Sequence, residues 1–296
     1  MENKVGVIGL GNMGGVLARN LLEAGFSVIG LDIDPDKVAV FESAGGFVAG
    51  SPAAVSHEAE IVILSLPNVK ALESVLHGDG GLVTEGREGV ICIESGTFPL
   101  AAKVAAEEAL AARGIHLLDC TVSGTGSQAA QRDIVFYTSG PVEPLERCAP
   151  VFQAISKAWP RVGDFGAGSI MKFVSNLLVT VHTVAAAEAL TLATKSGLDP
   201  AAALELMSAG AGQSRMLEVR GPLMTSGEYD VGSASVDTLA KDTEIILDFA
   251  ATQNSPVPLL SIAATFLRAA AANGLNDQDP AVVREIIGSM AGLGDS

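Results

Sequence analysis

The sequence predicts an α/β fold followed by an all-helical domain, and three observations lead to this prediction. A strand, a glycine turn, a helix and a second strand follow one another within the first 36 residues. Strand-like and helix-like segments then alternate through the first half, as in a parallel sheet covered by helices. From Gly166 on, strand signals vanish and alanine-rich helical stretches take over. We expect one domain over residues 1–163 and a second over residues 164–296.

The glycine turn follows the expected strand Val5–Ile8 and precedes an expected helix over 16–24. It reads Gly9-Leu10-Gly11-Asn12-Met13-Gly14. In such a turn the first glycine permits the bend, the second lets the backbone approach a pyrophosphate, and the third lets helix and strand pack closely. The amides and the dipole of the helix start then face the phosphates. The segment therefore predicts a dinucleotide-binding domain of the doubly wound Rossmann type.

The residue after the second strand indicates which dinucleotide binds. The apolar run Phe26–Leu31 ends at Asp32, about 20 residues beyond the turn, where an acid accepts hydrogen bonds from a ribose diol. A 2′-phosphate would need a cation there, usually arginine. The chain instead continues Ile33-Asp34-Pro35-Asp36, with Lys37 as the only nearby cation. The sequence therefore favours NAD over NADP, although a solvated turn would explain Asp34 and Asp36 equally well.

Bulk composition excludes several classes of protein. The 296 residues leave room for two domains, and polar residues interrupt the apolar runs, so we expect no membrane span. The first strand begins almost at once, which leaves no room for a cleavable signal. A net charge of −16 argues against nucleic acid and anionic membranes as partners. Cys92, Cys120 and Cys148 have no metal-ligand spacing and cannot all pair, so we expect no metal and a reducing cytoplasm.

Further elements can be placed from the apolar pattern. Strands are expected at Ile61–Leu66, Val90–Ile93, Ile115–Leu118 and Ile134–Thr138. Helices are expected at Pro35–Ala44, Pro144–Ser156, Pro200–Ala209, Val236–Thr252, Leu259–Asn273 and Pro280–Ala291. Ala167–Ser196 reads as one helix stopped by Gly197, about 45 Å long, which is enough to link two domains.

Ligands of a doubly wound sheet bind beyond the carboxyl ends of its strands. Three segments follow such ends: Leu66-Pro67-Asn68, Ser95-Gly96-Thr97 and the stretch from Asp119 to Gly126. The last is rich in small residues and hydroxyls, and its amides together with Ser123 could hold a carboxylate. An ordinary flexible turn would have the same composition.

Lys172 and Asn176 are four residues apart, so they share one face of the long helix. An ammonium can hydrogen-bond an alcohol or carbonyl oxygen and exchange its proton while a cofactor takes or gives hydride. From spacing alone, a surface lysine near an asparagine is the commoner explanation. Lys241-Asp242 likewise reads as an exposed ion pair, and Arg215 and Arg220 as structural residues or anion contacts.

Four motifs that occur in order along the chain favour a functional role for Lys172 over the structural explanation. They are the turn Gly9 to Gly14 (G-x-G-x-M-G), Asp119 to Gly124 (similar to D-A-P-V-S-G), Gly168 to Asn176 (G-x-x-x-K-x-x-x-N) and Leu239 to Asp242 (L-x-K-D). Together, and essentially end to end, they resemble the β-hydroxyacid dehydrogenases, the group that contains 3-hydroxyisobutyrate dehydrogenase and tartronate semialdehyde reductase.

The resemblance implies an NAD-dependent oxidoreductase that moves hydride between the cofactor and a small 3-hydroxy acid or its semialdehyde. Lys172 would be the general acid/base and Asn176 would contact the substrate. Ser123 and Gly124, with Thr125 beside them, would bind the substrate carboxylate.

The resemblance also implies the cofactor contacts. The glycine turn and Asp32 would bind the nucleotide, and Leu66-Pro67 would line the path from adenosine to nicotinamide. Lys241, supported by Asp242, would help to enclose the cofactor. Ser95-Gly96 stands where the family usually has a serine-threonine pair, with Thr97 one place later, so a hydroxyl on the nicotinamide side would come from Thr97 or be missing at Gly96.

Other departures leave the substrate open. Cys120-Thr121 replaces the usual Ala-Pro, which we expect to loosen and polarise the substrate loop. Thr125 and Arg132-Asp133 stand where glycines are frequent, and Arg215 lies in a segment near the substrate pocket of relatives. Two alternatives remain: an imine reductase-like enzyme, a group that usually lacks the lysine, and a non-catalytic dinucleotide-binding protein. A monomer would expose much apolar surface, so we expect a homodimer or homotetramer.

Overall fold

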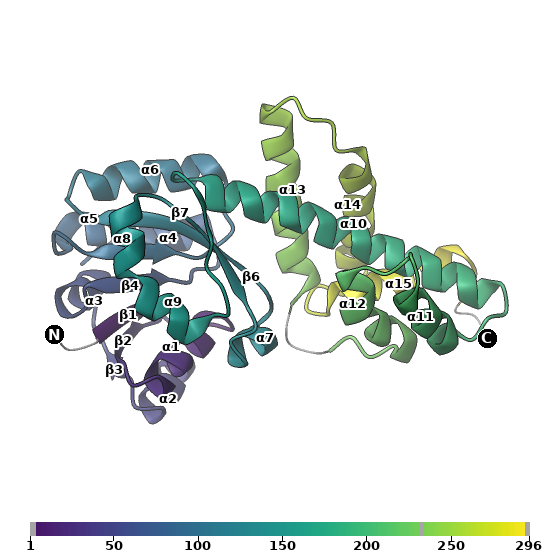
Figure 1. The fold of residues 1–296 in the computed structure, drawn as a ribbon, viewed down its shortest axis with the longest axis horizontal. Helices are drawn as coiled ribbons and strands as arrows, with labels where there is room; N and C mark the ends of the chain where they lie inside the picture. Colours follow the sequence, from purple (N-terminus) through teal and green to yellow (C-terminus); the bar gives the residue numbers. More distant parts are fainter. Residues whose placement is uncertain (1–3, 231–233, 294–296) are drawn as a thin grey trace. The chain divides into compact units, whose positions relative to one another are not determined.

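The computed structural model describes residues 4–230 and 234–293 and divides into two compact units, Met1–Lys172 and Phe173–Ser296. The first unit holds an eight-stranded sheet with helices on both faces, and the described part of the second is helical (Figure 1). The predicted fold class, a Rossmann-type α/β sheet followed by an all-α region joined by a long helix, is confirmed.

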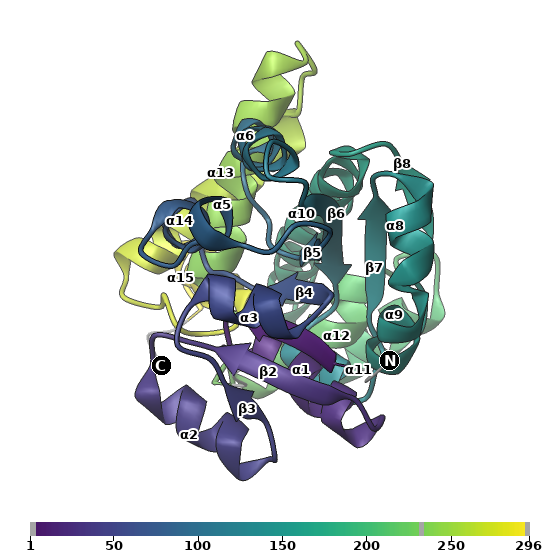
Figure 2. The same cartoon turned by 90° about the vertical axis from the view of Figure 1, so that its left-hand side faces the viewer.

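The sheet has the strand order β3-β2-β1-β4-β5-β6-β7-β8 (Figure 2). The strands are β1 (Lys4–Ile8), β2 (Ser27–Leu31), β3 (Phe47–Val48), β4 (Ile61–Leu64), β5 (Ile91–Glu94), β6 (His116–Ser123), β7 (Val135–Ser139) and β8 (Arg161–Gly163). The chain adds β2 and β3 on one side of β1 and the later strands on the other, so its order reverses between β1 and β4. The carboxyl ends of β1, β2, β4, β5 and β6 consequently lie along one edge of the sheet.

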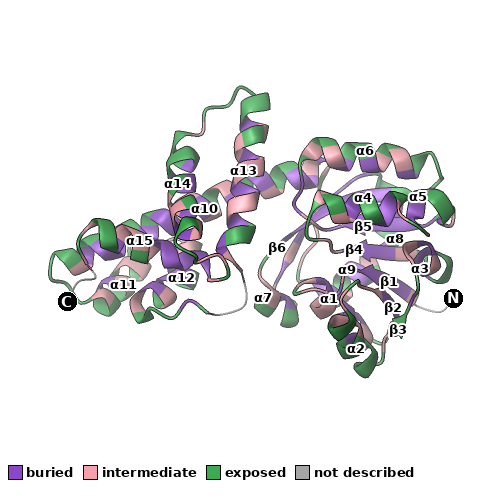
Figure 3. Cartoon of the chain, turned by 180° about the vertical axis from the view of Figure 1, so that it is seen from behind, coloured by how far each residue is buried: buried purple, intermediate pink, exposed green. Residues whose placement is uncertain are grey.

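Helices of the first unit cover the sheet in two layers. They are α1 (Gly14–Glu23), α2 (Pro35–Ser43), α3 (Pro52–Glu58), α4 (Val69–His77), α5 (Leu82–Glu85), α6 (Leu100–Ala111), α7 (Gly126–Ala130), α8 (Val142–Arg147) and α9 (Ala149–Ile155). The central strands are buried, whereas α2 is largely exposed (Figure 3).

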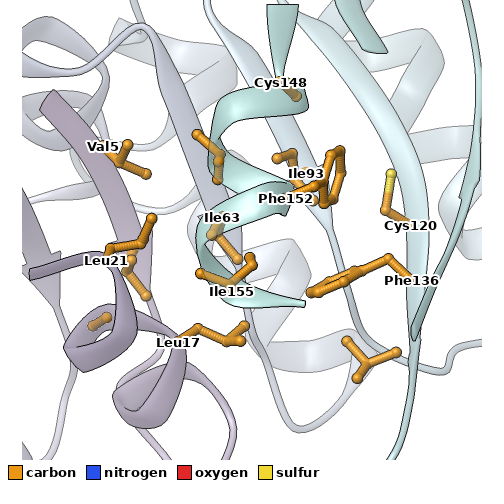
Figure 4. Packing of buried hydrophobic residues seen from close by; sticks show 14 of the residues in the cluster. Val5, Leu17, Leu21, Ile63, Ile93, Cys120, Phe136, Cys148, Phe152 and Ile155 are labelled. Carbon is orange, nitrogen blue, oxygen red and sulfur yellow. The ribbon is translucent and has the colours of Figure 1, made fainter. Parts of the chain in front are cut away.

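Alternate residues of each central strand enter opposite cores, as the pleat of a strand requires. Ile63 packs with α1 and α9 residues such as Leu17, Phe152 and Ile155 (Figure 4). Its neighbours Val62 and Leu64 belong to the other core, which contains residues of α3, α4, α5 and α6. This two-sided burial explains why the strands read as continuous apolar runs.

Several elements differ from the expectation. The strand expected at Ile115–Leu118 continues to Ser123, so most of the anticipated substrate loop is strand. It pairs antiparallel with β7, whereas the pattern suggested a wholly parallel sheet. The helix expected at Pro144–Ser156 is two helices that meet at Cys148. The short strand β8 was not predicted because three residues are too few for a periodic signal.

The helices of the second unit are α10 (Ala167–Lys195, which begins in the first unit), α11 (Pro200–Ala209), α12 (Arg215–Ser226), α13 (Val236–Thr252), α14 (Pro258–Ala272), η1 (Pro280–Val282) and α15 (Val283–Met290). They share one apolar core that includes Leu190, Leu217, Leu239 and Leu267. Helix α12 was not predicted. As expected, α10 ends just before Gly197, which adopts a left-handed conformation with φ +84°.

Within the described residues, α10 alone is long and apolar enough to cross a membrane by length and composition. Its polar side chains are those of a core helix, however. Asn176, Thr180 and Thr183 are buried and hydrogen-bond Asp242, Thr243 and Arg220 from neighbouring helices of the second unit.

Candidate active site

The glycine turn has the geometry that its sequence predicts. Gly9 has φ +92°, and a Cβ there would overlap the carbonyl oxygen of Ser65. A Cβ on Gly14 would overlap the carbonyl oxygen of Gly9, so both glycines are required by the backbone packing. A Cβ on Gly11 would meet nothing within 4 Å. The protein itself therefore does not require glycine at position 11, and the space beside it is open to a ligand.

Helix α1 begins at Gly14 without a side-chain cap on its first amides and without an acidic residue in its first turn. Leu10 is buried, Met13 is partly buried and Asn12 is exposed at the top of the turn. Uncapped amides at a helix start, next to three glycines, form an anion site that suits a pyrophosphate.

Asp32 joins this turn to the second strand. Its Oδ2 accepts a hydrogen bond from the amide of Leu10 at 2.6 Å, and its Oδ1 accepts one from the amide of Asp34 at 2.9 Å. Asp34 caps α2 by accepting from the amide of Asp36 at 3.0 Å. Asp32 thus fixes the glycine turn in addition to any contact with a ribose, while Asp34 and Asp36 have the ordinary roles that their helix start demands.

The tail of β4 has one side chain packed on the protein and one that is exposed. Leu66 is partly buried against the apolar core beneath it, and Pro67 is exposed. The Asn68 side chain accepts a hydrogen bond from the amide of Ala71 at 2.9 Å and so caps α4.

The tail of β5 turns tightly around Gly96. A Cβ on Gly96 would come within 2.6 Å of the Phe98 ring, so no larger residue fits there without rearrangement. The hydroxyl of Ser95 donates to the carbonyl oxygen of Leu64 at 2.7 Å. Thr97 is buried, with 8% of its surface exposed. A hydroxyl-bearing side chain would therefore not fit at position 96 without rearrangement. The hydroxyl of Ser95 is already engaged by the carbonyl oxygen of Leu64.

The end of β6 presents the predicted substrate loop. Ser123 is the last residue of the strand, and Gly124 follows with φ +141°, a conformation that favours glycine. Thr125 forms a capping box with Gln128 at the start of α7, so its hydroxyl serves the helix. A Cβ on Gly126 would lie 3.1 Å from the carbonyl oxygen of Asn12, which places this loop beside the glycine turn.

The expectation that Cys120-Thr121 loosens and polarises the loop is wrong. Cys120 is fully buried in the apolar core of the sheet. Thr121 is fully buried as well, and its hydroxyl donates to the carbonyl oxygen of Gly168 at 2.8 Å. Both residues lie inside β6, where antiparallel pairing with β7 fixes them.

Lys172 and Asn176 lie one turn apart on α10. Lys172 is partly buried and is the last residue of the first unit. Asn176 is buried in the second unit, and its Nδ2 donates to Oδ2 of Asp242 at 2.8 Å. The other oxygen of Asp242 is 3.0 Å from Nζ of Lys241. The interaction of Asp242 with Asn176 was missed at the sequence level, because 66 residues separate them and neither motif points to the other.

Known proteins share this arrangement along nearly the whole chain. Residues 4–166 match the family model for the NAD binding domain of 6-phosphogluconate dehydrogenase. Residues 166–286 match the model for the NAD-binding region of NADP-dependent 3-hydroxyisobutyrate dehydrogenase. An L-threonate dehydrogenase of Cupriavidus necator is 37% identical over 286 residues, which is 96% of both chains.

The chain belongs to the β-hydroxyacid dehydrogenase family.

This dehydrogenase has further relatives of the same kind. A 3-hydroxyisobutyrate dehydrogenase of Pseudomonas aeruginosa is 34% identical over 88% of this chain and 89% of its own. The crystal structure of 3-hydroxyisobutyrate dehydrogenase from Salmonella typhimurium superposes with a TM-score of 0.86 at 31% identity, covering 96% of this chain and 99% of that one. Imine reductases share the fold at only 16–21% identity. The predictions of an NAD-dependent hydroxyacid dehydrogenase and of NAD as cofactor are confirmed.

The residues of the dehydrogenase's first unit fit the cofactor. The open side of Gly11, the uncapped start of α1 and the position of Asp32 would suit the pyrophosphate and ribose of a dinucleotide. Among the described residues, no group of three or more histidine, cysteine or acidic side chains is placed to hold a metal ion.

The two arginines proposed as anion contacts of the dehydrogenase have protein partners. Arg215 is exposed and pairs with Glu218 of the same helix at 2.9 Å. Arg220 is buried, with its Nε 3.0 Å from Asp279 and its Nη1 donating to the Thr183 hydroxyl at 2.7 Å. Arg220 is therefore a structural residue of the second unit.

Proposed function

We propose that the dehydrogenase oxidises a small 3-hydroxy acid, or reduces its semialdehyde, with Lys172 as the general acid/base. The observation that carries the proposal is the anchoring of the first turn of α10 to β6, the strand that ends at Ser123. Lys172 lies in the next turn of the helix. Ser123 and Gly124 then offer amides and a hydroxyl for the substrate carboxylate, and Thr125 beside them holds the start of α7 through its capping box.

Each protein group has a definite task in this proposal. NAD, which the glycine turn and Asp32 would hold, would supply the hydride chemistry. Lys172 as a neutral amine takes the hydroxyl proton during oxidation, and as an ammonium returns it to the carbonyl oxygen during reduction. Because Nδ2 of Asn176 donates to Asp242, its carbonyl oxygen can accept a hydrogen bond from the substrate. Lys241 encloses the cofactor, with Asp242 as its neighbour at 3.0 Å.

Small polyhydroxy acids are the first substrates to test, since the Cupriavidus relative is named for L-threonate. The assay is NADH absorbance at 340 nm with L-threonate, 3-hydroxyisobutyrate, glycerate, serine and 4-hydroxybutyrate. Turnover of one hydroxy acid supports the proposal. Turnover of imines alone, or tight NADH binding without any turnover, would contradict it.

Lys172→Ala tests the general acid/base. We expect kcat to fall by roughly 10²–10⁴-fold while NADH binding is retained. Lys195→Ala is the matched control, because Lys195 is exposed at the far end of the same helix. Unchanged turnover in Lys172→Ala would remove this residue from the mechanism.

We propose that NAD is used in preference to NADP, for which the carboxylate of Asp32 is the main support. Ile33 follows it and is fully exposed, so its side chain can be exchanged without disturbing a core. Ile33→Arg should raise kcat/KM with NADP by about tenfold, because the guanidinium can pair with a 2′-phosphate. A wild-type preference for NADP would contradict the assignment of Asp32.

We also propose that residues 1–163 form the cofactor domain, that residues 164–296 form a helical domain, and that the enzyme works in the cytoplasm as a homodimer or homotetramer. Large apolar side chains are exposed on the helices of the second unit, among them Leu178, Leu192, Leu206, Leu259 and Ile262. The acidic charge of −16 disfavours nucleic acid and anionic membranes. Light scattering coupled to gel filtration measures the assembly, and a monomer at micromolar concentration would contradict it.

A further inference from the structure

Three charged side chains are fully buried beside the sheet edge that carries the cofactor and substrate loops. Glu94 is the last residue of β5 and is paired in register with Asp119 on β6. Lys103 reaches them from α6, contacts Glu94, and donates to Oδ1 of Asp119 at 2.8 Å and to the carbonyl oxygen of Gly96 at 2.7 Å. We call Glu94, Lys103 and Asp119 the buried triad.

Burial of the triad carries a large desolvation penalty. Attraction between buried charges offsets this penalty only when the partners are well placed, and here one ammonium serves two carboxylates. Burial raises the pKa of Glu94, although Lys103 opposes that shift. Burial alone would lower the pKa of Lys103, but the two carboxylates reverse the effect and raise it. An apolar trio could fill the same volume, so stability by itself does not account for these charges.

The other side of Asp119 faces the start of α10. Its Oδ2 accepts a hydrogen bond from the amide of Ser169 at 2.7 Å, and its Oδ1 accepts one from the Ser169 hydroxyl at 2.9 Å. The hydroxyl of Ser139 on β7 donates to the backbone carbonyl of Asp119 and accepts from the amide of Gly168, both at 2.9 Å. With the bond from Thr121 to the Gly168 carbonyl, β6 and β7 bind both polar groups of the Gly168 backbone.

Gly168 permits this close approach. A Cβ at that position would lie 2.5 Å from the carbonyl oxygens of both Asp119 and Tyr137. A carboxylate at the amides of a helix start also interacts favourably with the helix dipole. Asp119 therefore acts as a cap supplied from 50 residues away, and it ties the first turn of α10 to β6.

Lys172 follows Ser169 by three residues and Gly168 by four, so it lies on the same side of α10, one turn beyond the anchor. Ser123 follows Asp119 by four residues along β6. One buried carboxylate thus joins the strand that leads to the substrate loop with the helix that carries the general acid/base.

We propose that Asp119, held by Lys103 and Glu94, is a positioning residue for Lys172 that aims its amine at the reacting oxygen of the substrate. This inference rests on the proposed function. It differs from a structural role in what it predicts: the proton-transfer step changes, while cofactor binding does not.

Ser169→Ala and Asp119→Asn test the proposal in the full-length enzyme. Ser169→Ala deletes one bond to Asp119 and should lower kcat by about tenfold, with the KM and the Kd for NADH within about twofold of wild type. Asp119→Asn removes the charge and places an amide near the Ser169 amide, and should lower kcat by on the order of 10²-fold. In both variants the limb of the kcat–pH profile that depends on Lys172 should move.

Ser156→Ala is the matched control, because it too removes one hydrogen bond from a buried serine hydroxyl, which here donates to the carbonyl oxygen of Phe152, and does not touch α10. If Asp119→Asn fails to fold, Ser169→Ala decides the matter. A kcat and pH profile of Ser169→Ala equal to those of Ser156→Ala would overturn the positioning role. If Lys172→Ala, assayed in parallel, keeps full turnover, the proposed function fails first and the inference falls with it. Loss of turnover in Lys172→Ala with unaffected Ser169→Ala refutes the inference alone.

Discussion

Both units of the molecule bury charged side chains that hold α10, but they do so differently. In the first unit the buried triad has two carboxylates for one ammonium and is bound to the first turn of the helix through Asp119. In the second unit Arg220 faces a single carboxylate, Asp279, and donates to Thr183 in the middle of the helix. The first arrangement places two carboxyl groups against one ammonium, whereas the second pairs one carboxyl group with one guanidinium.

The difference shows that similar buried ion pairs can serve different ends. The Arg220 pair joins α10 and α12 with the residue before η1 and contacts none of the candidate site residues, so we assign it to stability. The buried triad lies at strand ends, next to Gly96 and one helical turn from Lys172. The group with unequal numbers of acidic and basic side chains, the buried triad, is therefore the one that binds α10 next to the proposed general acid/base.

The largest effect should come from removing either cation. Lys103→Met and Arg220→Met each leave buried carboxylate without its partner, and each should cost about 3–5 kcal/mol of unfolding free energy, measured by urea denaturation. The two variants should differ in kcat. Arg220→Met should keep the wild-type kcat per folded molecule, whereas Lys103→Met should lose much of it because Asp119 is no longer held. Equal losses of kcat would show that both attachments have the same role.

A double variant sharpens this contrast. Combining Arg220→Met with Asp279→Asn removes both charges of the neutral pair, so unfolding free energy should recover in part. Combining Lys103→Met with Glu94→Gln should likewise recover stability but not kcat. Recovery of kcat in that variant would mean that the ammonium is not needed to hold Asp119.

A smaller effect is expected at the third turn of α10, where Asp242 accepts a hydrogen bond from Asn176. Asp242→Ala removes the acceptor of the buried Asn176 amide and the partner of Lys241, so kcat/KM should fall by about tenfold and the free energy of unfolding by roughly 1–3 kcal/mol. Asp248→Ala is the control, since Asp248 is exposed on the same helix. Steady-state kinetics and thermal unfolding of both variants decide the point. A stability loss without a change in kcat/KM would make Asp242 structural, like Asp279.

The effect that is smallest at neutral pH, because it develops only from about pH 9 upward, is a difference in alkaline stability between the units. Burial raises the pKa of Cys92 and of Cys148 to about 12, from an ordinary value of 9.0. Between these values the unfolded chain loses the thiol protons and the folded chain keeps them, so stability falls as pH rises, by about 1.4 kcal/mol per pH unit for each thiol. The raised pKa of Lys103 adds a further loss above 10.5.

In the second unit burial raises the pKa of Tyr229 above its ordinary value of 10.0, so the corresponding loss starts at higher pH. Hydrogen exchange of peptides from each unit, followed from pH 8 to 11, should show the first unit opening earlier. Simultaneous opening, or an unchanged pH dependence in Cys92→Ala with Cys148→Ala, would contradict this account.

The sequence anticipated those elements whose signal is local. The apolar run of β4 and the glycines of the turn sit within a few residues of the structure that they specify, and the long helix ended at its expected glycine. Where the expectation failed, a distant partner decided the outcome. β6 extends to Ser123 because β7 pairs with it. Thr121 therefore lies in the strand and not in the substrate loop, and its hydroxyl donates to the carbonyl oxygen of Gly168.

The sequence by itself determined the fold class and the cofactor, because the glycine turn, the alternating elements and Asp32 are local signals, and its four ordered motifs gave the family through their resemblance to the β-hydroxyacid dehydrogenases. Only the tertiary structure decided how the proposed site is held. Asp119 reaches Ser169 across 50 residues and Asn176 reaches Asp242 across 66. Hydrogen bonds and ion pairs between buried groups depend on where the folded chain brings its polar atoms together. Contacts between residues so far apart in the sequence cannot be predicted from periodicity or from a local motif.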